Sequence, residues 1–214
     1  MSVAAVFDFD GTLMDTEPVI HASFEHVFQK YRTVEEFTEE RRIKVLGPAL
    51  EVMMAEFFPE RDPWECVEEY RRYQREHLRD LIKPMPGARE MLVKLSAMGI
   101  PCGIVSTRYF KSLDDLLRAN HMNEFMSIVL GNDSVTKSKP DPEGILKAWD
   151  AMKTDRCFYI GDSAMDVQAG KSAGAITVAY PSNPAKRSAL LEAQPDYIIE
   201  SLLELPDLIR EGDD

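Results

Sequence analysis

Apolar segments alternate regularly with helix-like segments over residues 88–209, and this alternation constrains the fold more than any other feature. Short apolar runs predict strands, and apolar residues three and four apart predict helices. The expected strands are Cys102–Ser106, Ser127–Leu130, Cys157–Ile160, Ile176–Ala179 and Tyr197–Ile199. The expected helices are Ala88–Met98, Lys111–Asn120, Pro142–Met152, Ala164–Ala173, Pro184–Ala193 and Leu202–Ile209. Such alternation predicts a parallel sheet with helices on both faces, a three-layer Rossmann-like α/β core.

The first strand is separated from the others by a long helical interval. Val3–Phe7 reads as a strand of the same sheet, but the next strand begins only near Pro101. The interval from Thr16 to Leu81 carries helical patterns, broken by turn signals such as Gly47-Pro48. We therefore expect an inserted α-helical cap domain over residues 16–83, and a core built from residues 1–15 and 84–214. The alternative is that these helices simply cover one face of the sheet.

Composition and charge narrow the classes of partner. A chain of 214 residues with 44% hydrophobic residues can bury a sizeable core. A net charge of −12 argues against nucleic acid or an anionic membrane as the main partner. No apolar run approaches the ~18 residues of a membrane span, and no basic region precedes the first apolar stretch. Cys102 and Cys157 lie in apolar runs and are expected to be buried. We expect a cytoplasmic protein, either a monomer or a homodimer.

Polar side chains follow several of the expected strands. In an open α/β sheet, ligands bind beyond the carboxyl ends of the strands. The residues at these ends are Asp8, Asp10, Gly11 and Thr12 after the first strand, Ser106, Thr107 and Arg108 after the second, Lys137, Lys139 and Pro140 in the loop 131–142, and Gly161, Asp162 and Asp166 after the fourth. Residues i and i+2 of a strand point the same way, which predicts that Asp8 and Asp10 emerge side by side. Two buried like charges need a cation, a shared proton or chemistry to compensate.

Each of these segments also has an ordinary structural interpretation. Asp8 to Gly11 could be an acidic turn, Ser106-Thr107 a helix cap, Lys139 a loop lysine, and Gly161-Asp162 a turn into a helix. Their occurrence in this order, each just past an expected strand, favours a shared catalytic site.

Taken together, these segments resemble the motif set of the haloacid dehalogenase-like hydrolase superfamily. The set reads Asp-x-Asp-Gly-Thr-Leu, then Ser/Thr, then Lys-Pro, then Gly-Asp-x-x-x-Asp. The helical insert resembles the cap of the subfamily that contains phosphoglycolate phosphatases, β-phosphoglucomutases and a bacterial pyrophosphatase. Gly47-Pro48-Ala49-Leu50 and Tyr70-Arg71 resemble cap segments of the phosphoglycolate phosphatase and pyrophosphatase branch.

The resemblance implies a Mg²⁺-dependent phosphatase acting on a small phosphorylated metabolite, with phosphoglycolate as first choice and pyrophosphate as second. Asp8 would be the nucleophile that forms an aspartyl-phosphate, and Asp10 the general acid, with Lys139 as a third catalytic residue. Mg²⁺ would be held by Asp8, the backbone carbonyl of Asp10, and Asp162, with Asp166 in the outer shell. The implied phosphate-binding residues are Gly11, Ser106, Thr107 and Lys139, with Lys137 a weaker choice. The implied specificity residues of the cap are Gly47, Pro48 and Arg71, with Arg41, Arg42, Arg72 and His77 as alternatives.

Three other functions remain open at this point. A true dehalogenase is disfavoured, because the resemblance implies that such relatives lack the second aspartate, and Asp10 is present. A β-phosphoglucomutase-like mutase would need a His near the start of the cap, where His21 and His26 are the candidates. A catalytically inactive binding protein on the same scaffold would be expected to have lost one of the motif residues.

Overall fold

The computed structural model describes residues 1–78 and 81–211, which fall into two compact units. One unit joins Met1–Met14 to Pro84–Asp214, and the other spans Asp15–Lys83. The short strands β2 (Met14–Asp15) and β3 (Lys83–Pro84) pair with each other where the chain passes from one unit to the other. Among the described residues, no helix is both long and apolar enough to cross a membrane.

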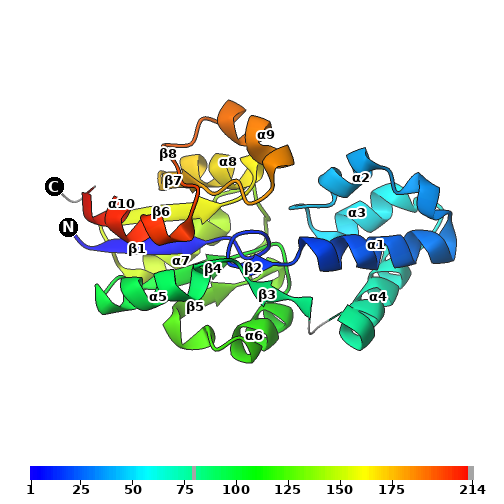
Figure 1. Ribbon diagram of the computed structural model, residues 1–214, viewed down its shortest axis with the longest axis horizontal. Coiled ribbons are helices and arrows are strands. Elements are labelled where there is room, and N and C mark those ends of the chain that lie inside the picture. Colours follow the sequence, from blue (N-terminus) through cyan, green and yellow to red (C-terminus); the bar gives the residue numbers. More distant parts are fainter. Residues whose placement is uncertain (79–80, 212–214) are drawn as a thin grey trace. The chain divides into compact units, whose positions relative to one another are not determined.

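The first unit is built on a six-stranded parallel sheet, which confirms the predicted α/β fold class (Figure 1). Its order is β5 (Met126–Leu130), β4 (Cys102–Val105), β1 (Val3–Phe7), β6 (Arg156–Gly161), β7 (Ile176–Ala179) and β8 (Tyr197–Ile198). All five residues of β1 are buried, as expected for a central strand covered on both faces. Each strand lies within about one residue of its predicted bounds.

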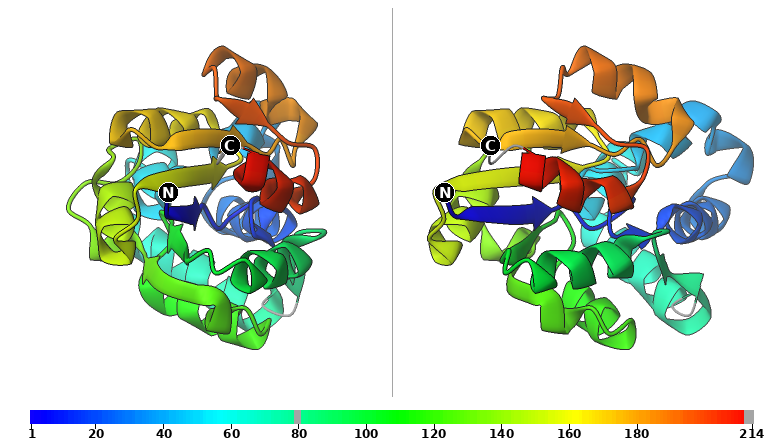
Figure 2. Two further views of the ribbon diagram at one scale, coloured as in Figure 1. Left: turned by 90° about the vertical axis from the view of Figure 1, so that its left-hand side faces the viewer. Right: turned by 60° about the vertical axis from the view of Figure 1, so that its left-hand side comes forward.

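Helices cover both faces of this sheet, as Figure 2 shows in its left view. α7 (Glu143–Met152) and α8 (Ala164–Ala173) pack together on one face, over β5 to β7. α5 (Ala88–Ala97) packs against α10 (Leu205–Glu211) on the other face. The remaining helices are α6 (Phe110–Ala119) and α9 (Arg187–Glu192), and the short 3₁₀ turns are η4 (Asn123–Phe125), η5 (Asn132–Ser134), η6 (Pro184–Lys186) and η7 (Leu202–Glu204).

Two helices predicted as single elements begin instead with a separate 3₁₀ turn. The predicted helix Pro184–Ala193 is divided into η6 and α9, and Leu202–Ile209 into η7 and α10. In η6 the Asn183 side chain accepts a hydrogen bond from the backbone N–H of Ala185 at 2.8 Å. In η7 Ser201 accepts one from Leu203 at 3.3 Å. These local caps stabilise a tight first turn that periodicity alone does not reveal.

The strand register explains why distant segments meet at one edge of the sheet. Phe7, the last residue of β1, is paired with Ile104 of β4 on one side and Ile160 of β6 on the other. The chain segments that follow these strands therefore leave the sheet at nearly the same level. Residues that are remote in sequence are brought together at this carboxyl edge.

The second unit, over its described residues, consists of helices. These are α1 (Glu17–Tyr31), α2 (Glu39–Lys44), α3 (Leu50–Phe57) and α4 (Pro63–Tyr73), with a 3₁₀ turn η1 (Val34–Glu36) and a π-helical turn η2 (Gln74–Leu78). Phe24 and Phe28 of α1 stack with Phe37, with ring centroids 5.8 and 5.1 Å apart. α1 and α4 are also joined through Glu69, a buried carboxylate bound by His26 at 2.6 Å and Lys30 at 2.7 Å.

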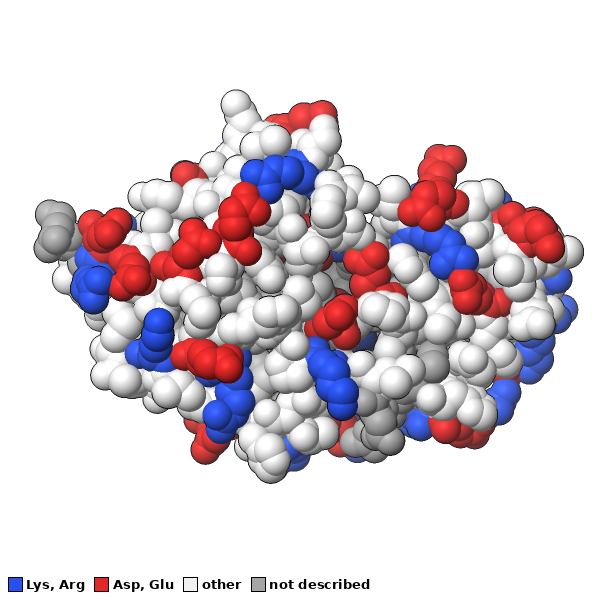
Figure 3. Space-filling view, viewed as in Figure 1, with Lys and Arg blue, Asp and Glu red and all other residues white. Residues whose placement is uncertain are grey.

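The charged residues do not gather into one patch on the face drawn in Figure 3. Acidic and basic side chains are interspersed there with uncharged surface. Several ion pairs of the described residues join side chains about one helical turn apart, such as Arg118 with Asp114 at 2.8 Å. The face drawn does not present a single acidic surface.

Candidate active site

Asp8 lies immediately after β1 and is buried, with 6% of its surface exposed. Its backbone N–H donates to the carbonyl oxygen of Ile160, at 2.8 Å, which continues the pairing of β1 with β6. Lys139 Nζ donates to Asp8 Oδ1 at 2.6 Å. The other carboxylate oxygen accepts no hydrogen bond from any residue that the structure describes. Asp8 is thus held at one oxygen and open at the second.

Lys139 connects Asp8 to Asp166. Its ammonium group lies 2.6 Å from Asp8 Oδ1 and 2.6 Å from Asp166 Oδ1. The lysine side chain is only 5% exposed, and the Lys139-Pro140 peptide bond is cis. Burial alone would lower the pKa of Lys139, but the two carboxylates outweigh it and hold the pKa well above its usual value. Lys139 is therefore a fixed positive charge within the site.

Asp166 is fully engaged by hydrogen-bond donors. Besides Lys139, it accepts from the Tyr159 hydroxyl at 3.1 Å and from the Ser163 hydroxyl at 2.5 Å. The Ser163 backbone N–H also donates to it at 3.1 Å, because Ser163 and Asp166 form the capping box of α8. Burial would raise the pKa of Asp166, yet Lys139 and these hydrogen bonds outweigh burial and lower it. Asp166 is an ionised residue that organises its neighbours.

Asp162 lies in the turn between β6 and α8, and its carboxylate is bound by a second lysine. Lys186 Nζ is 2.5 Å from Asp162 Oδ2. The same oxygen is adjacent to Gly11, where a side chain would not fit: a Cβ at this position would lie 2.2 Å from Asp162 Oδ2. Gly11 also has a φ of 78°, a conformation that favours glycine. The glycine of the first motif therefore makes space for the aspartate of the last.

The carboxylates of Asp8, Asp162 and Asp166 form a buried cluster, with one oxygen of each lying within 4.8 Å of the others. Burial raises the pKa of Asp8 to about 8 although Lys139 opposes the rise, and nearby carboxylates add to it. Burial also raises the pKa of Asp162, against the opposing charge of Lys186. A divalent cation would favour the ionised form of both residues. Carboxylate oxygens are the ligands that Mg²⁺ prefers, so the donor set fits this ion.

Asp10 is near enough to Asp8 for its charge to raise the pKa of Asp8 further, and the expectation that the two side chains emerge side by side stays a prediction. The Asp10 carboxylate is bound by Arg108 at both oxygens, with Nη2–Oδ1 at 2.6 Å and Nε–Oδ2 at 3.2 Å. β1 ends at Phe7, so both aspartates lie beyond the strand. The two aspartates have different partners.

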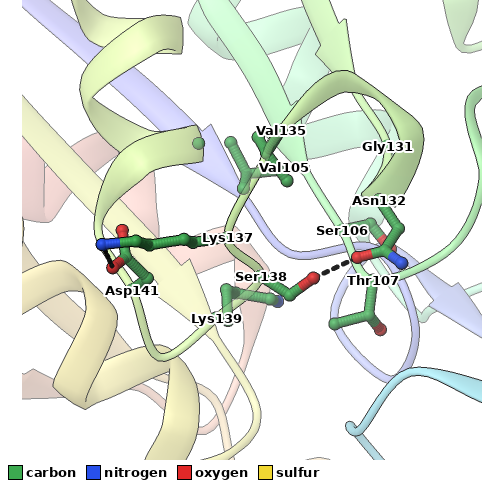
Figure 4. A pocket seen from close by; sticks show the side chains of 11 residues that line it. Val105, Ser106, Thr107, Gly131, Asn132, Val135, Lys137, Ser138, Lys139 and Asp141 are labelled. Carbon is green, nitrogen blue, oxygen red and sulfur yellow. Dashed lines mark hydrogen bonds and ion pairs between the residues drawn. The ribbon is translucent and has the colours of Figure 1, made fainter. Parts of the chain in front are cut away.

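A pocket beside Lys139 contains three of the four predicted phosphate-binding residues, Ser106, Thr107 and Lys139 (Figure 4). Ser106 follows β4, is 5% exposed, and accepts a hydrogen bond on its Oγ from the Arg108 backbone N–H at 3.1 Å. Gly11, the fourth predicted residue, is absent from this lining, and its N–H donates to the Met14 carbonyl at 2.8 Å.

Lys137 also lines the pocket, but its ammonium group is directed to a different partner. Nζ lies 3.7 Å from Asp141 Oδ2, and 73% of the side chain is exposed. Figure 4 shows this pair away from Ser106 and Thr107. The two lysines of the loop are therefore not equivalent, and Lys139 is the one that contacts the carboxylates.

The predicted specificity residues Gly47, Pro48 and Arg71 belong to the other unit, and their role stays a prediction. Arg71 lies 3.9 Å from Glu68 on the same helix. The alternatives Arg42, Arg72 and His77 pair with glutamates of that unit, and Arg41 donates to the Glu36 carbonyl at 2.7 Å.

The sequence places Arg108 at the end of the second strand without indicating its role, and no motif in it points to Lys186. Arg108 follows Ser106-Thr107 directly, but its guanidinium cannot be assigned a target from sequence. Lys186 lies in the segment after β7, which has no recognisable motif. Its position beyond the carboxyl end of β7 is the one signal in the sequence that points to it.

The chain is similar to known proteins over nearly its whole length. The family model described as haloacid dehalogenase-like hydrolase matches residues 5–180. Pyrophosphatase PpaX of Listeria monocytogenes is 32% identical over 211 residues, which cover 96% of this chain and 95% of that protein. A haloacid dehalogenase-like hydrolase from Bacteroides fragilis has a TM-score of 0.86 at 27% identity, over 96% of this chain and 100% of the other. A predicted phosphoglycolate phosphatase from Haemophilus somnus has a TM-score of 0.85 at 20% identity, over 96% and 97% of the two chains.

Proposed function

Since the chain belongs to the haloacid dehalogenase-like hydrolases, we propose that it is a Mg²⁺-dependent phosphatase that works through an aspartyl-phosphate on Asp8. The observation that carries the proposal is the carboxylate of Asp8: one oxygen is bound by Lys139, and the other is open beside Asp162 and Asp166. A buried carboxylate held at one oxygen is oriented for attack through the other.

Phosphoryl transfer depends mainly on positioning and on charge stabilisation. In this proposal Lys139 and the Ser106 hydroxyl bind the phosphoryl oxygens, because both residues follow strands at the carboxyl edge of the sheet. Thr107 follows Ser106 directly and extends the polar surface. Asp166 keeps Lys139 in place and keeps it charged.

The residues that would hold Mg²⁺ are Asp8 and Asp162, with the backbone carbonyl of Asp10 and with Asp166 in an outer shell. Asp166 fits the outer position because hydrogen bonds already occupy both of its oxygens. Bound there, the ion would neutralise charge on the phosphoryl group and on the nucleophile. Three buried carboxylates face two ammonium groups in this site, so added positive charge is compatible with it.

Asp10 would carry the proton to the leaving oxygen and later accept one from water. Its side chain is 20% exposed, more than that of Asp8, so it can reach a proton from solvent. Arg108 binds both of its oxygens, which favours the ionised form suited to the second step. In the first step Asp10 would act in its protonated form, held in position by Arg108 through the oxygen that does not carry the proton.

The comparisons favour pyrophosphate over phosphoglycolate as the substrate, the reverse of the order expected from sequence. The relative of 32% identity that covers nearly the whole chain is a pyrophosphatase. The structural neighbour described as a phosphoglycolate phosphatase is only 20% identical, and that likeness concerns the fold. The mutase alternative is weakened, because His26 binds Glu69 at 2.6 Å and His21 contacts the Arg42 carbonyl oxygen at 3.0 Å. Both histidines thus have structural partners.

The proposal is tested by phosphate release from a panel of pyrophosphate, phosphoglycolate, sugar phosphates and mononucleotides, with Mg²⁺ and with a chelator. We expect metal-dependent release, fastest with pyrophosphate, and its loss in Asp8→Asn. Asp150→Asn, an exposed aspartate of α7, is the matched control and should behave as wild type. Undiminished release by a clean Asp8→Asn preparation would refute the assignment of the nucleophile.

A further inference from the structure

Lys186 brings a second ammonium group into the carboxylate cluster from an unrelated part of the chain. It is the last residue of η6, in the segment that follows β7. Its Nζ lies 2.5 Å from Asp162 Oδ2, with 10% of the lysine side chain and 3% of the aspartate side chain exposed. The Asn183 cap fixes the backbone of η6, and the Ser182 hydroxyl is 3.5 Å from the same oxygen.

The two lysines of the site are held differently. Lys139 bridges Asp8 and Asp166, so moving it breaks two ion pairs. Lys186 forms a hydrogen bond to Asp162 alone among the described side chains. Lys186 is therefore the ammonium that can leave at the lower cost.

An ammonium group and a divalent cation both bind to the lone pairs of a carboxylate, and when both lie close to one oxygen they repel each other. At Asp162 the ammonium group of Lys186 occupies an oxygen that the proposed Mg²⁺ ion would also use. With Lys186 in place, Asp162 is a neutralised, buried carboxylate. A cation that binds Asp162 has to displace the ammonium group or share the carboxylate with it.

We propose that Lys186 is a tethered cation that competes with Mg²⁺ for Asp162, and thereby sets the Mg²⁺ concentration at which the site fills. This inference rests on the metal site of the proposed function. It adds a regulatory consequence: the protein without metal keeps a folded site in which Asp162 is paired with Lys186, and metal loading responds to the supply of free Mg²⁺.

Calorimetric titration of metal-free protein with MgCl₂ tests the inference. We expect Lys186→Gln to bind Mg²⁺ at least about tenfold more tightly than wild type, because the competing charge is gone. The same variant without metal should unfold at a temperature lower by about 2–4 °C, since the Asp162 carboxylate loses the positive charge that faces it, and saturating Mg²⁺ should remove that difference. Lys111→Gln makes the same change of charge on an exposed residue of α6 and should match wild type in both measurements.

The outcomes separate this inference from the metal site on which it rests. If wild type binds Mg²⁺ and Lys186→Gln binds it equally or less tightly, competition by Lys186 is wrong while the metal site stands. If wild type and Lys186→Gln both fail to bind Mg²⁺, the metal site itself is wrong. Should Lys186→Gln not fold, the lysine ammonium signals of wild type can be followed by NMR during Mg²⁺ addition. Displacement predicts that the signal of the buried Lys186 changes at the binding midpoint, and an unchanged signal would contradict it.

Discussion

Arg108 binds Asp10 through two nitrogen atoms, with Nη2 2.6 Å from Oδ1 and Nε 3.2 Å from Oδ2. A third nitrogen, Nη1, donates to the Ser112 hydroxyl at 3.1 Å and so anchors the guanidinium to α6. Asp8, two residues earlier in the chain, is bound instead by Lys139. Two aspartates of one motif thus depend on two cations from different loops, and each can be perturbed separately.

Arg108→Lys should impair substrates with poor leaving groups more than substrates with good ones. Lysine keeps the charge but cannot hold both oxygens of Asp10, so the proposed proton carrier is less well placed. We expect kcat to fall about tenfold more for an alkyl phosphate than for p-nitrophenyl phosphate, whose leaving group needs no proton. Asp10→Asn should show the same selectivity. Equal losses on both substrates would indicate that Arg108 does not act through Asp10.

Lys139→Gln should abolish most of the activity, whereas Lys137→Gln should not. Lys139 contacts two carboxylates of the site, and removing its charge leaves them uncompensated. We expect kcat to fall roughly a hundredfold or more. Lys137 lies in the same loop, is largely exposed, and serves as the matched control. Phosphate-release kinetics with circular dichroism as a check on folding would distinguish the two lysines, and comparable losses in both variants would contradict the assignment.

Gly11→Ala should lower both the free energy of unfolding and the affinity for Mg²⁺. Gly99→Ala is the control that separates the effect of backbone strain from the effect of a collision with Asp162. Both glycines have positive φ, 78° and 73°, so alanine is strained at either position. A Cβ on Gly11 also collides with Asp162 Oδ2, whereas one on Gly99 meets no atom within 4 Å. We expect about 1 kcal/mol of destabilisation in Gly99→Ala and roughly 2–4 kcal/mol in Gly11→Ala. Mg²⁺ affinity, measured by calorimetry, should fall only in Gly11→Ala. Unchanged affinity in this variant would show that Asp162 can move away from the added methyl group without affecting Mg²⁺ binding.

Glu69→Gln should lower the free energy of unfolding of the helical unit near neutral pH, and this loss should be smaller at acidic pH. Burial would raise the pKa of Glu69, but hydrogen bonds from Lys30, His26 and Arg72 outweigh burial and lower it from 4.5 to about 2. Because the folded pKa is the lower one, the stabilisation is complete above about pH 4.5 and is lost as the pH falls toward 2.

Unfolding by urea at several pH values checks this prediction. The difference in unfolding free energy between wild type and Glu69→Gln should be about 2 kcal/mol near pH 7 and should shrink below about pH 4.5. Glu68→Gln, the neighbouring and exposed glutamate, should differ little from wild type throughout. A difference that is independent of pH would show that the ion-pair cluster is not its source.

The sheet could be predicted from sequence because its strands are apolar runs separated by helical patterns. Ile176–Ala179 has the same bounds in sequence and structure, and so does Val3–Phe7. Local capping escaped prediction, as at Ser201, since a side-chain hydrogen bond decides between a 3₁₀ turn and an α-helical turn. Apolar periodicity does not carry that information.

The site was only partly predictable, for two physical reasons. The convergence of Asp8, Asp162 and Asp166 follows from parallel strands whose ends lie level, which sequence order can indicate. The direction of a long side chain depends on tertiary neighbours, so the pairing of Arg108 with Asp10 could not be read from spacing. Lys186 was missed because η6 has no motif that marks it.

The sheet order also determines when the site can exist during synthesis. β1 is made first yet occupies an interior position, between β4 and β6. Lys139 follows Asp8 by 131 residues, and Lys186 comes later still. A ribosome that has translated only as far as β4 thus carries the proposed nucleophile without the lysines that contact the carboxylate cluster. We expect hydrolytic capacity to begin only after Lys186 has been made, so that translation products terminated before it would carry Asp8 in an inactive form.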